Sequence, residues 1–201
     1  MPLRLPDPGS FKARLGPVLV PVASLVRLSN YPASEPYWGK RAASRFDAPK
    51  EISPADRFGV CYAGDCLETA FAESVIHDGI DYRADGFVVA EADILSRHWT
   101  TFALPARTEL KMVDLTGHAL KSLGLNNDIS SGDAYATPQA WAAAVHAHDP
   151  SWDGIRSVSR QNKERFCYAI FERSAMTVVE TRPLATREMA HLCDAFRVST
   201  I

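Results

Sequence analysis

Five polar side chains, scattered through the sequence, are of types that together could bind and break a charged organic molecule. They are Arg27, Arg45, Tyr62, Glu73 and Ser159. Arginine presents a planar fork that holds phosphate oxygens in pairs, and a glutamate can stabilise a developing cation or move a proton. Tyrosine can stack on a ring, and serine can orient a substrate through its hydroxyl. The arginines could therefore form an anion site, and the other three are further polar residues that could take part in chemistry.

Each of these residues also has a purely structural interpretation. Arg27 lies in an apolar run, Ser24 to Leu28, and could be an edge-strand arginine that reaches solvent. Lys40, Arg41 and Arg45 form a cluster that could be solvated surface or could add guanidinium groups to an anion site beside Arg27.

The stretch from Phe58 to Asp78 predicts the element that carries Tyr62 and Glu73. Phe58, Val60 and Tyr62 alternate as in a strand, and Asp65 and Glu68 have the spacing of a capping box that opens a helix. We expect this helix to run to about residue 78 and to stop at Gly79. Glu73 lies off the apolar face of the helix, so its carboxylate faces either a cleft or water.

Further strands are expected at 24–28, 86–92, 109–115, 166–171 and 176–180, with a hairpin joining the last two, and residues 152–160 are expected to form a turn that leads into a strand. Helices are expected after Thr116, from Thr137 and from Thr186, and the polar stretch 126–136 is a candidate loop over a site. Strands and helices do not alternate regularly, which predicts a single mixed α+β domain over residues 21–201. Residues 1–20 are predicted to be an N-terminal arm, with residues 1–16 lying over the body outside the core.

Composition excludes several classes of function. A net charge of −2 and an isoelectric point near 6.3 give no basic footprint for direct nucleic-acid binding. Four cysteines without metal-site spacing argue against a bound metal and favour a reducing, cytoplasmic location. The apolar run Pro17 to Val26 is too short and too rich in proline for a membrane span or a targeting signal. No Walker, Rossmann, zincin or nucleophile-elbow motif occurs.

The order of the motifs resembles the RES domain family, whose name comes from its arginine, glutamate and serine. The matching segments span roughly Arg27 to Glu180. They are the early strand arginine, R-F at Arg45, G-V-x-Y-x-A from Gly59 to Ala63, E-T-A-x-A-E from Glu68 to Glu73, D-G-I-x-x-x-S-R from Asp153 to Arg160, and the strand C-Y-A-I-F-E-R. Two positions depart from the pattern, because many relatives carry tyrosine where this chain has Leu28 and Ser157.

The resemblance implies a toxin of a bacterial toxin–antitoxin pair with a β-sheet core like that of ADP-ribosyltransferases. NAD would be its substrate, no metal would be required, and the acceptor would be water, phosphate or a protein target. Glu73, Arg27 and Ser159 would be catalytic, and Arg27, Arg45, Tyr62 and Ser159 would hold NAD. The partner would be an antitoxin with an Xre-like DNA-binding region.

Two other functions remain open at this stage. One is a metal-independent ribonuclease toxin that uses arginine, glutamate and a histidine such as His77. The negative net charge of the chain argues against this function, because RNA binding depends on neutralising phosphate charge. The other is a non-catalytic binding module whose polar residues serve only the fold.

Overall fold

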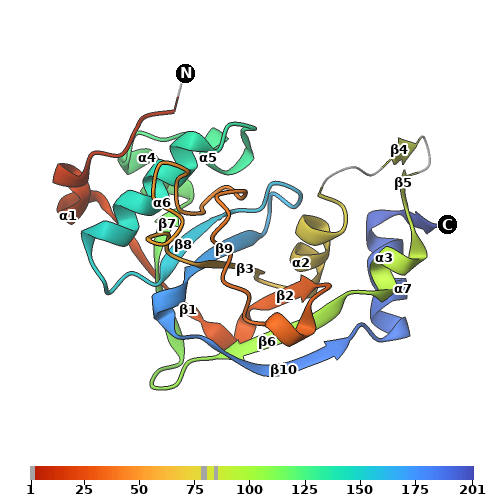
Figure 1. Cartoon of the computed structure of the whole chain (residues 1–201). Coiled ribbons are helices and arrows are strands. Elements are labelled where there is room, and N and C mark those ends of the chain that lie inside the picture. The colour runs from red at the N-terminus through yellow and green to blue at the C-terminus, as the bar shows by residue number, and fades with distance from the viewer. Residues whose placement is uncertain (1–2, 78–80, 84–85) are drawn as a thin grey trace.

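A computed structural model of the protein, which describes residues 3–77, 81–83 and 86–201, is built around one large mixed sheet (Figure 1). Its eight described strands lie in the order β1 (Pro17–Pro21), β7 (Glu109–Leu115), β8 (Gly154–Val158), β9 (Phe166–Phe171), β3 (Val60–Gly64), β2 (Val26–Ser29), β6 (His98–Ala103) and β10 (Thr177–Pro183). Only β7 and β8 run parallel; the other neighbours in this sheet are antiparallel. A small second sheet contains β11 (Val198–Thr200), β5 (Gly86–Val89) and β4 (Asp81–Arg83). The expected single α+β domain is confirmed.

The helices gather at the two ends of the large sheet (Figure 1). One end carries α1 (Phe11–Arg14), α4 (Gly117–Ser122), α5 (Asp128–Ser131) and α6 (Ala136–His148), and the other carries α2 (Leu67–Ser74), α3 (Glu91–Leu95) and α7 (Thr186–Phe196). Short 3₁₀ turns occur at η1 (Pro8–Ser10), η2 (Val22–Ser24), η3 (Pro32–Ser34) and η4 (Glu172–Ser174). None of the described helices has the length and apolar composition needed to cross a membrane.

Separate apolar clusters pack each helical end onto the sheet. Trp141 and Val145 of α6 pack with Ile155 of β8, and Phe71 of α2 packs with Val26 and Leu28 of β2. Each cluster buries a face of apolar residues at helical spacing, which is the main source of stability for such short helices. The two groups of helices are thereby fixed to one sheet: the cluster of α6 includes residues of β8, β9 and β3, and the cluster of α2 includes residues of β2.

The helix that carries Glu73 differs from its prediction at both ends. It begins at Leu67 after Cys66, with no side-chain cap, so the expected capping box is wrong. Asp65 instead accepts a hydrogen bond from the Thr69 hydroxyl at 2.7 Å and another from the Phe166 amide at 3.1 Å, which ties the helix start to β9. The helix ends at Ser74, and the stop expected at Gly79 lies outside the described residues.

Strands β7 and β9 occupy the predicted residues, but the hairpin expected between β9 and β10 is wrong. The chain leaves β9 through η4, with Ala175 in the left-handed region, and β10 then pairs with β6 at the far edge of the sheet. Strands β3, β2 and β6 therefore separate the two. The turn residues predicted a change of direction correctly, but they do not specify which strand the chain pairs with afterwards.

The N-terminal segment is also more integrated than an arm. Phe11 is 1% exposed, and its ring stacks on Trp141 with ring centroids 5.5 Å apart. Residues 17–21 form β1, which pairs along its length with β7. Part of the segment expected outside the core therefore belongs to the packed body.

Candidate functional site

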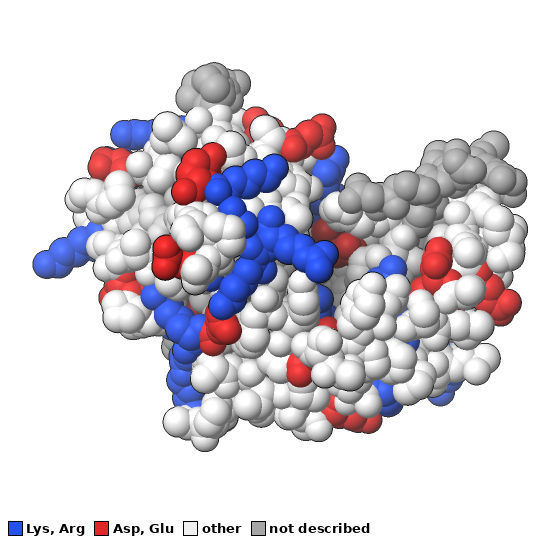
Figure 2. Space-filling model, viewed as in Figure 1, with Lys and Arg blue, Asp and Glu red and all other residues white. Residues whose placement is uncertain are grey.

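A pocket of about 510 Å³ opens between the two helical ends, above strands β2, β3, β8 and β9. Figure 2 shows this face hollowed beside a group of basic side chains. The pocket is lined by residues from the strands, from α2, from the loop after η3 and from the start of the α5–α6 segment. Four of the five residues singled out from sequence line it: Arg27, Arg45, Tyr62 and Glu73. Its size is in the range of small-molecule sites.

Glu73 is half-buried in this pocket, near the C-terminal end of α2. Its Oε1 atom accepts a hydrogen bond from the Ser159 hydroxyl at 2.5 Å and one from the Gln161 amide at 3.2 Å. Both bonds reach the same oxygen, so Oε2 keeps acceptor capacity for a ligand. Glu73 is therefore a fixed carboxylate in a pocket and not a solvated helix residue.

Ser159 lies directly after β8 and sits behind Glu73. Ser159 is 1% exposed. Its hydroxyl donates a hydrogen bond to Glu73 and accepts one from the Asn162 amide at 2.9 Å, so both its donor and an acceptor position are already occupied within the protein. This placement suits a serine that orients Glu73 better than one that touches a substrate itself.

Cys167 of β9 lines the pocket close to the same carboxylate. Burial, and then the negative charge of Glu73, raise the pKa of the Cys167 thiol. The thiol therefore stays protonated at neutral pH. It is a neutral wall of the pocket and not a nucleophile.

Arg27 projects from β2 and is held from two sides. Its Nε donates to Glu35 Oε1 at 2.9 Å, and its Nη1 donates to the backbone oxygen of Tyr62 at 2.9 Å. Its side chain is 19% exposed, whereas that of Glu35 is 0% exposed. Arg27 is thus an ion-paired, oriented guanidinium that lines the pocket, not an edge residue reaching into bulk solvent.

Arg45 reaches the pocket from the loop after η3. Its Nη1 donates to the Gly132 carbonyl at 2.7 Å, and its guanidinium carbon lies 4.8 Å from the centre of the Tyr135 ring. Burial, together with the positive charge of Arg160, lowers the pKa of Arg45. Arg160 also lines the pocket, and its partner Asp133 is almost fully exposed. Arg45 and Arg160 therefore both bring positive charge to the pocket that also holds the Glu73 carboxylate.

Tyr62 contributes its ring to the pocket, but its hydroxyl is occupied. The hydroxyl donates to Asp47 Oδ1 at 3.0 Å and accepts from the Phe46 amide at 2.9 Å, while Asp47 Oδ2 accepts from the amides of Ala43 and Ser44. Burial raises the pKa of Tyr62 well above its usual value. The expected stacking role fits this geometry, whereas a hydrogen bond from Tyr62 to a substrate does not.

Sequence reasoning did not single out Glu35, Asp47, Tyr135, Arg160, Gln161 or Cys167. Glu35 and Asp47 lie in irregular chain without periodicity, so nothing in the sequence marked their carboxylates as buried partners of Arg27 and Tyr62. Tyr135 lies in the stretch 126–136 expected to form a loop over a site, and it does line the pocket. Part of that stretch is helical, as α5.

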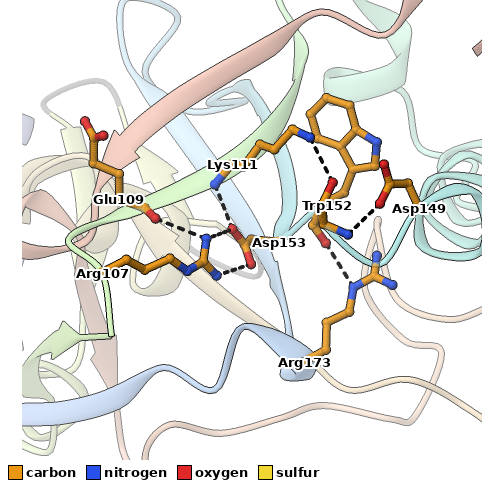
Figure 3. A network of polar contacts seen from close by, with 8 residues as sticks. Arg107, Glu109, Lys111, Asp149, Trp152, Asp153 and Arg173 are labelled. Carbon is orange, nitrogen blue, oxygen red and sulfur yellow. Dashed lines mark hydrogen bonds and ion pairs between the residues drawn. The ribbon is translucent and has the colours of Figure 1, made fainter. Parts of the chain in front are cut away.

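Asp153, the aspartate of the D-G-I motif, belongs to a different place. It lies at the opposite end of β8 from Ser159, where both of its oxygens accept hydrogen bonds from Arg107 at 2.5 Å (Figure 3). The backbone amide of Lys111 donates to it at 2.7 Å, which clamps β7 against the start of β8. Asp153 is thus a structural residue of the motif, and Ser159 at the other end of the strand is the one near the pocket.

A family model, the RES domain, matches residues 23–190. This match covers most of the chain, so the protein belongs to the RES domain family, the toxin domain of RES–Xre toxin–antitoxin systems. A search of curated proteins found no match to this chain. Among the residues that the structure describes, no three His, Cys, Asp or Glu side chains gather closely enough to hold a metal ion.

Proposed function

We propose that this toxin-domain protein cleaves NAD at the bond between nicotinamide and ribose. The observation that carries the proposal is the position of Glu73, a carboxylate fixed by Ser159 and Gln161 in a pocket that Arg27, Arg45 and Arg160 also line. The nicotinamide–ribose bond of NAD becomes positively charged at the ribose as it breaks, and a carboxylate can stabilise that charge. The neighbouring pyrophosphate is negatively charged, and guanidinium groups can bind it.

The chemical step follows from the charge of the reacting centre. When the bond from the ribose C1′ to the nicotinamide nitrogen breaks, its electron pair leaves with nicotinamide, and the ribose becomes an oxocarbenium-like cation. Glu73 stabilises this cation and can accept a hydrogen bond from a ribose hydroxyl through Oε2. An acceptor, which is water, phosphate or a protein side chain, then forms a bond to C1′, and any proton on its attacking atom is released to solvent.

The other residues bind and orient. Arg45 and Arg160 hold the pyrophosphate, and Arg27 adds the N–H groups that Glu35 and the Tyr62 carbonyl leave free. The Tyr62 ring packs beside the nicotinamide ribose. Ser159 acts through Glu73, because its hydroxyl already has both partners.

The test is an incubation of the purified protein with NAD, in which released nicotinamide is measured in buffer, with phosphate and with cell lysate. Release in buffer alone indicates water as the acceptor, and stimulation by phosphate or lysate indicates the other two. A parallel incubation with RNA tests the ribonuclease alternative, for which His77, a residue that lines the same pocket, would be the histidine. RNA cleavage without nicotinamide release would overturn the proposal in favour of that alternative.

RES domain toxins pair with antitoxins, and we propose that the partner here is an Xre-like protein that inserts a segment into this pocket. A carboxylate of that segment would take the place of the pyrophosphate on the arginines, so NAD and antitoxin would compete. Antitoxin affinity should then fall as a non-cleavable NAD analogue is added. Binding of both at full affinity would place the antitoxin elsewhere.

A further inference from the structure

Glu35 has a fully buried side chain and pairs with the pocket residue Arg27, but it is not itself one of the residues that line the pocket. Its side chain is 0% exposed. A carboxylate is costly to bury unless it is paired and hydrogen-bonded. The contacts of Glu35 therefore point to a specific task.

Those contacts divide between Arg27 and the chain's own backbone. Glu35 Oε1 accepts from Arg27 Nε at 2.9 Å, and Oε2 accepts from the Tyr37 amide at 3.0 Å. The segment that carries Glu35 leaves β2, turns through η3 and returns, and Gly39 then pairs with Val60 of β3. The Glu35 carboxylate is thus held in place by a backbone amide of its own segment as well as by Arg27.

The arginine in turn has a fixed orientation. With Nε on Glu35 and Nη1 on the Tyr62 carbonyl, the guanidinium plane is set by two bonds from opposite directions. Within the described residues, Glu35 accepts from Nε, the Tyr62 carbonyl accepts from Nη1, and Nη2 donates no hydrogen bond to the protein. The N–H groups of Nη2 are therefore available to an anion in the pocket that Arg27 lines.

We infer that Glu35 is a positioning residue for substrate binding: it fixes the guanidinium of Arg27 so that the Nη2 side of the fork faces the ligand. This inference rests on the proposed function. Without Glu35, the long arginine side chain would have to be ordered by the ligand itself, at a cost in affinity. The substitution E35Q keeps the size of the side chain but removes the charge and offers an amide donor where an acceptor is needed.

The experiment measures the binding of ADP-ribose, which has the pyrophosphate but no bond to nicotinamide, by calorimetry, alongside steady-state NAD cleavage. E35Q should weaken ADP-ribose binding roughly tenfold or more and raise KM for NAD in proportion, with a smaller change in kcat, because a hydrogen bond between charged groups is lost. R27K should weaken binding to a similar degree, since lysine cannot reproduce the fork. The double variant R27K/E35Q should be no weaker than R27K, because Glu35 acts only through Arg27.

The matched control is E188Q. Glu188 also pairs with a guanidinium, that of Arg182, and accepts from a backbone amide, that of Ala185, but it belongs to α7, away from the pocket. E188Q should leave ADP-ribose affinity and KM unchanged, and thermal unfolding of each variant checks that it is folded. Unchanged affinity in folded E35Q, tighter binding in E35Q, or additive losses in the double variant would each overturn the inference alone. A wild-type chain that binds neither ADP-ribose nor NAD would overturn the proposed function and the role of Glu35 with it.

Discussion

Replacing Ser159 with alanine separates orientation of Glu73 from contact with the substrate. The change removes two hydrogen bonds at once: the one that the hydroxyl donates to Glu73 at 2.5 Å and the one that it accepts from Asn162 at 2.9 Å. A hydrogen bond to a charged group contributes about 1.5–3 kcal/mol. Because Glu73 is only half-buried and keeps the Gln161 amide, we expect the free energy of unfolding to fall by about 2 kcal/mol.

The poorer orientation of Glu73 should also slow catalysis. We expect the activation free energy of NAD cleavage to rise by about 1.4–2.8 kcal/mol, which lowers kcat about 10- to 100-fold. KM should change little, because the Ser159 hydroxyl is buried behind the carboxylate and already has both partners. The assay is nicotinamide release over a range of NAD concentrations, with urea unfolding measured in parallel.

The control is S174A. Ser174 is also a buried serine, but its hydroxyl has no hydrogen-bond partner within the described part of the chain, so S174A should cost little stability and no activity. A folded S159A protein with unchanged kcat would refute the positioning role. A rise in KM with kcat intact would show instead that the hydroxyl touches the substrate.

Three further predictions follow from the site and its frame. R45K should weaken NAD binding about tenfold, since lysine cannot bond Gly132 and a phosphate with one planar fork, and calorimetry with ADP-ribose measures this. D153N should lower the free energy of unfolding by about 2–3 kcal/mol, less than for a fully buried pair because the Arg107 side chain is 43% exposed, and urea unfolding should show this without a change in KM. Burial, and then the positive charge of Arg173, lower the pKa of His146 to about 4 from 6.5, so the unfolded chain binds the proton more readily than the folded chain. The free energy of unfolding should therefore fall as the pH drops from about 6.5 to 4. The variant H146F should show a weaker pH dependence of stability, and an unchanged dependence would contradict this prediction.

Local patterns in the sequence were enough to predict the elements, but not their partners in space. Strands β7 and β9 alternate or run apolar over their full length, so their residues could be predicted exactly. The pairing of β10 with β6 depends on contacts about 80 residues apart, to which no local signal refers. Strand β6 and the edge strand β1 were also missed. For β1 the reason is local, since Pro17 and Pro21 argue against a strand although they suit the edge of a sheet.

For the site, too, the sequence predicts which residues take part but not which partners they contact. The family motifs contain Arg27, Arg45, Tyr62 and Glu73, and the fold gathers them into one pocket although they come from different elements. The motifs could not assign the hydrogen bonds: Tyr62 is satisfied by Asp47, and Ser159 by Glu73. Asp47 lies in an irregular loop, and Glu73 lies on a helix 86 positions from Ser159 in the sequence, so only the folded geometry identifies these partners.

The most direct test of the account compares nicotinamide release from NAD by the wild-type chain and by E73Q, with ADP-ribose binding as a check on the pocket. Glutamine keeps the shape of Glu73 and one acceptor for Ser159 but removes the charge that stabilises the ribose cation. We predict rapid release by the wild type, at least a hundredfold slower release by E73Q, and similar ADP-ribose affinity for both. Equal rates of nicotinamide release by the two folded proteins would contradict the central claim that Glu73 is the catalytic carboxylate.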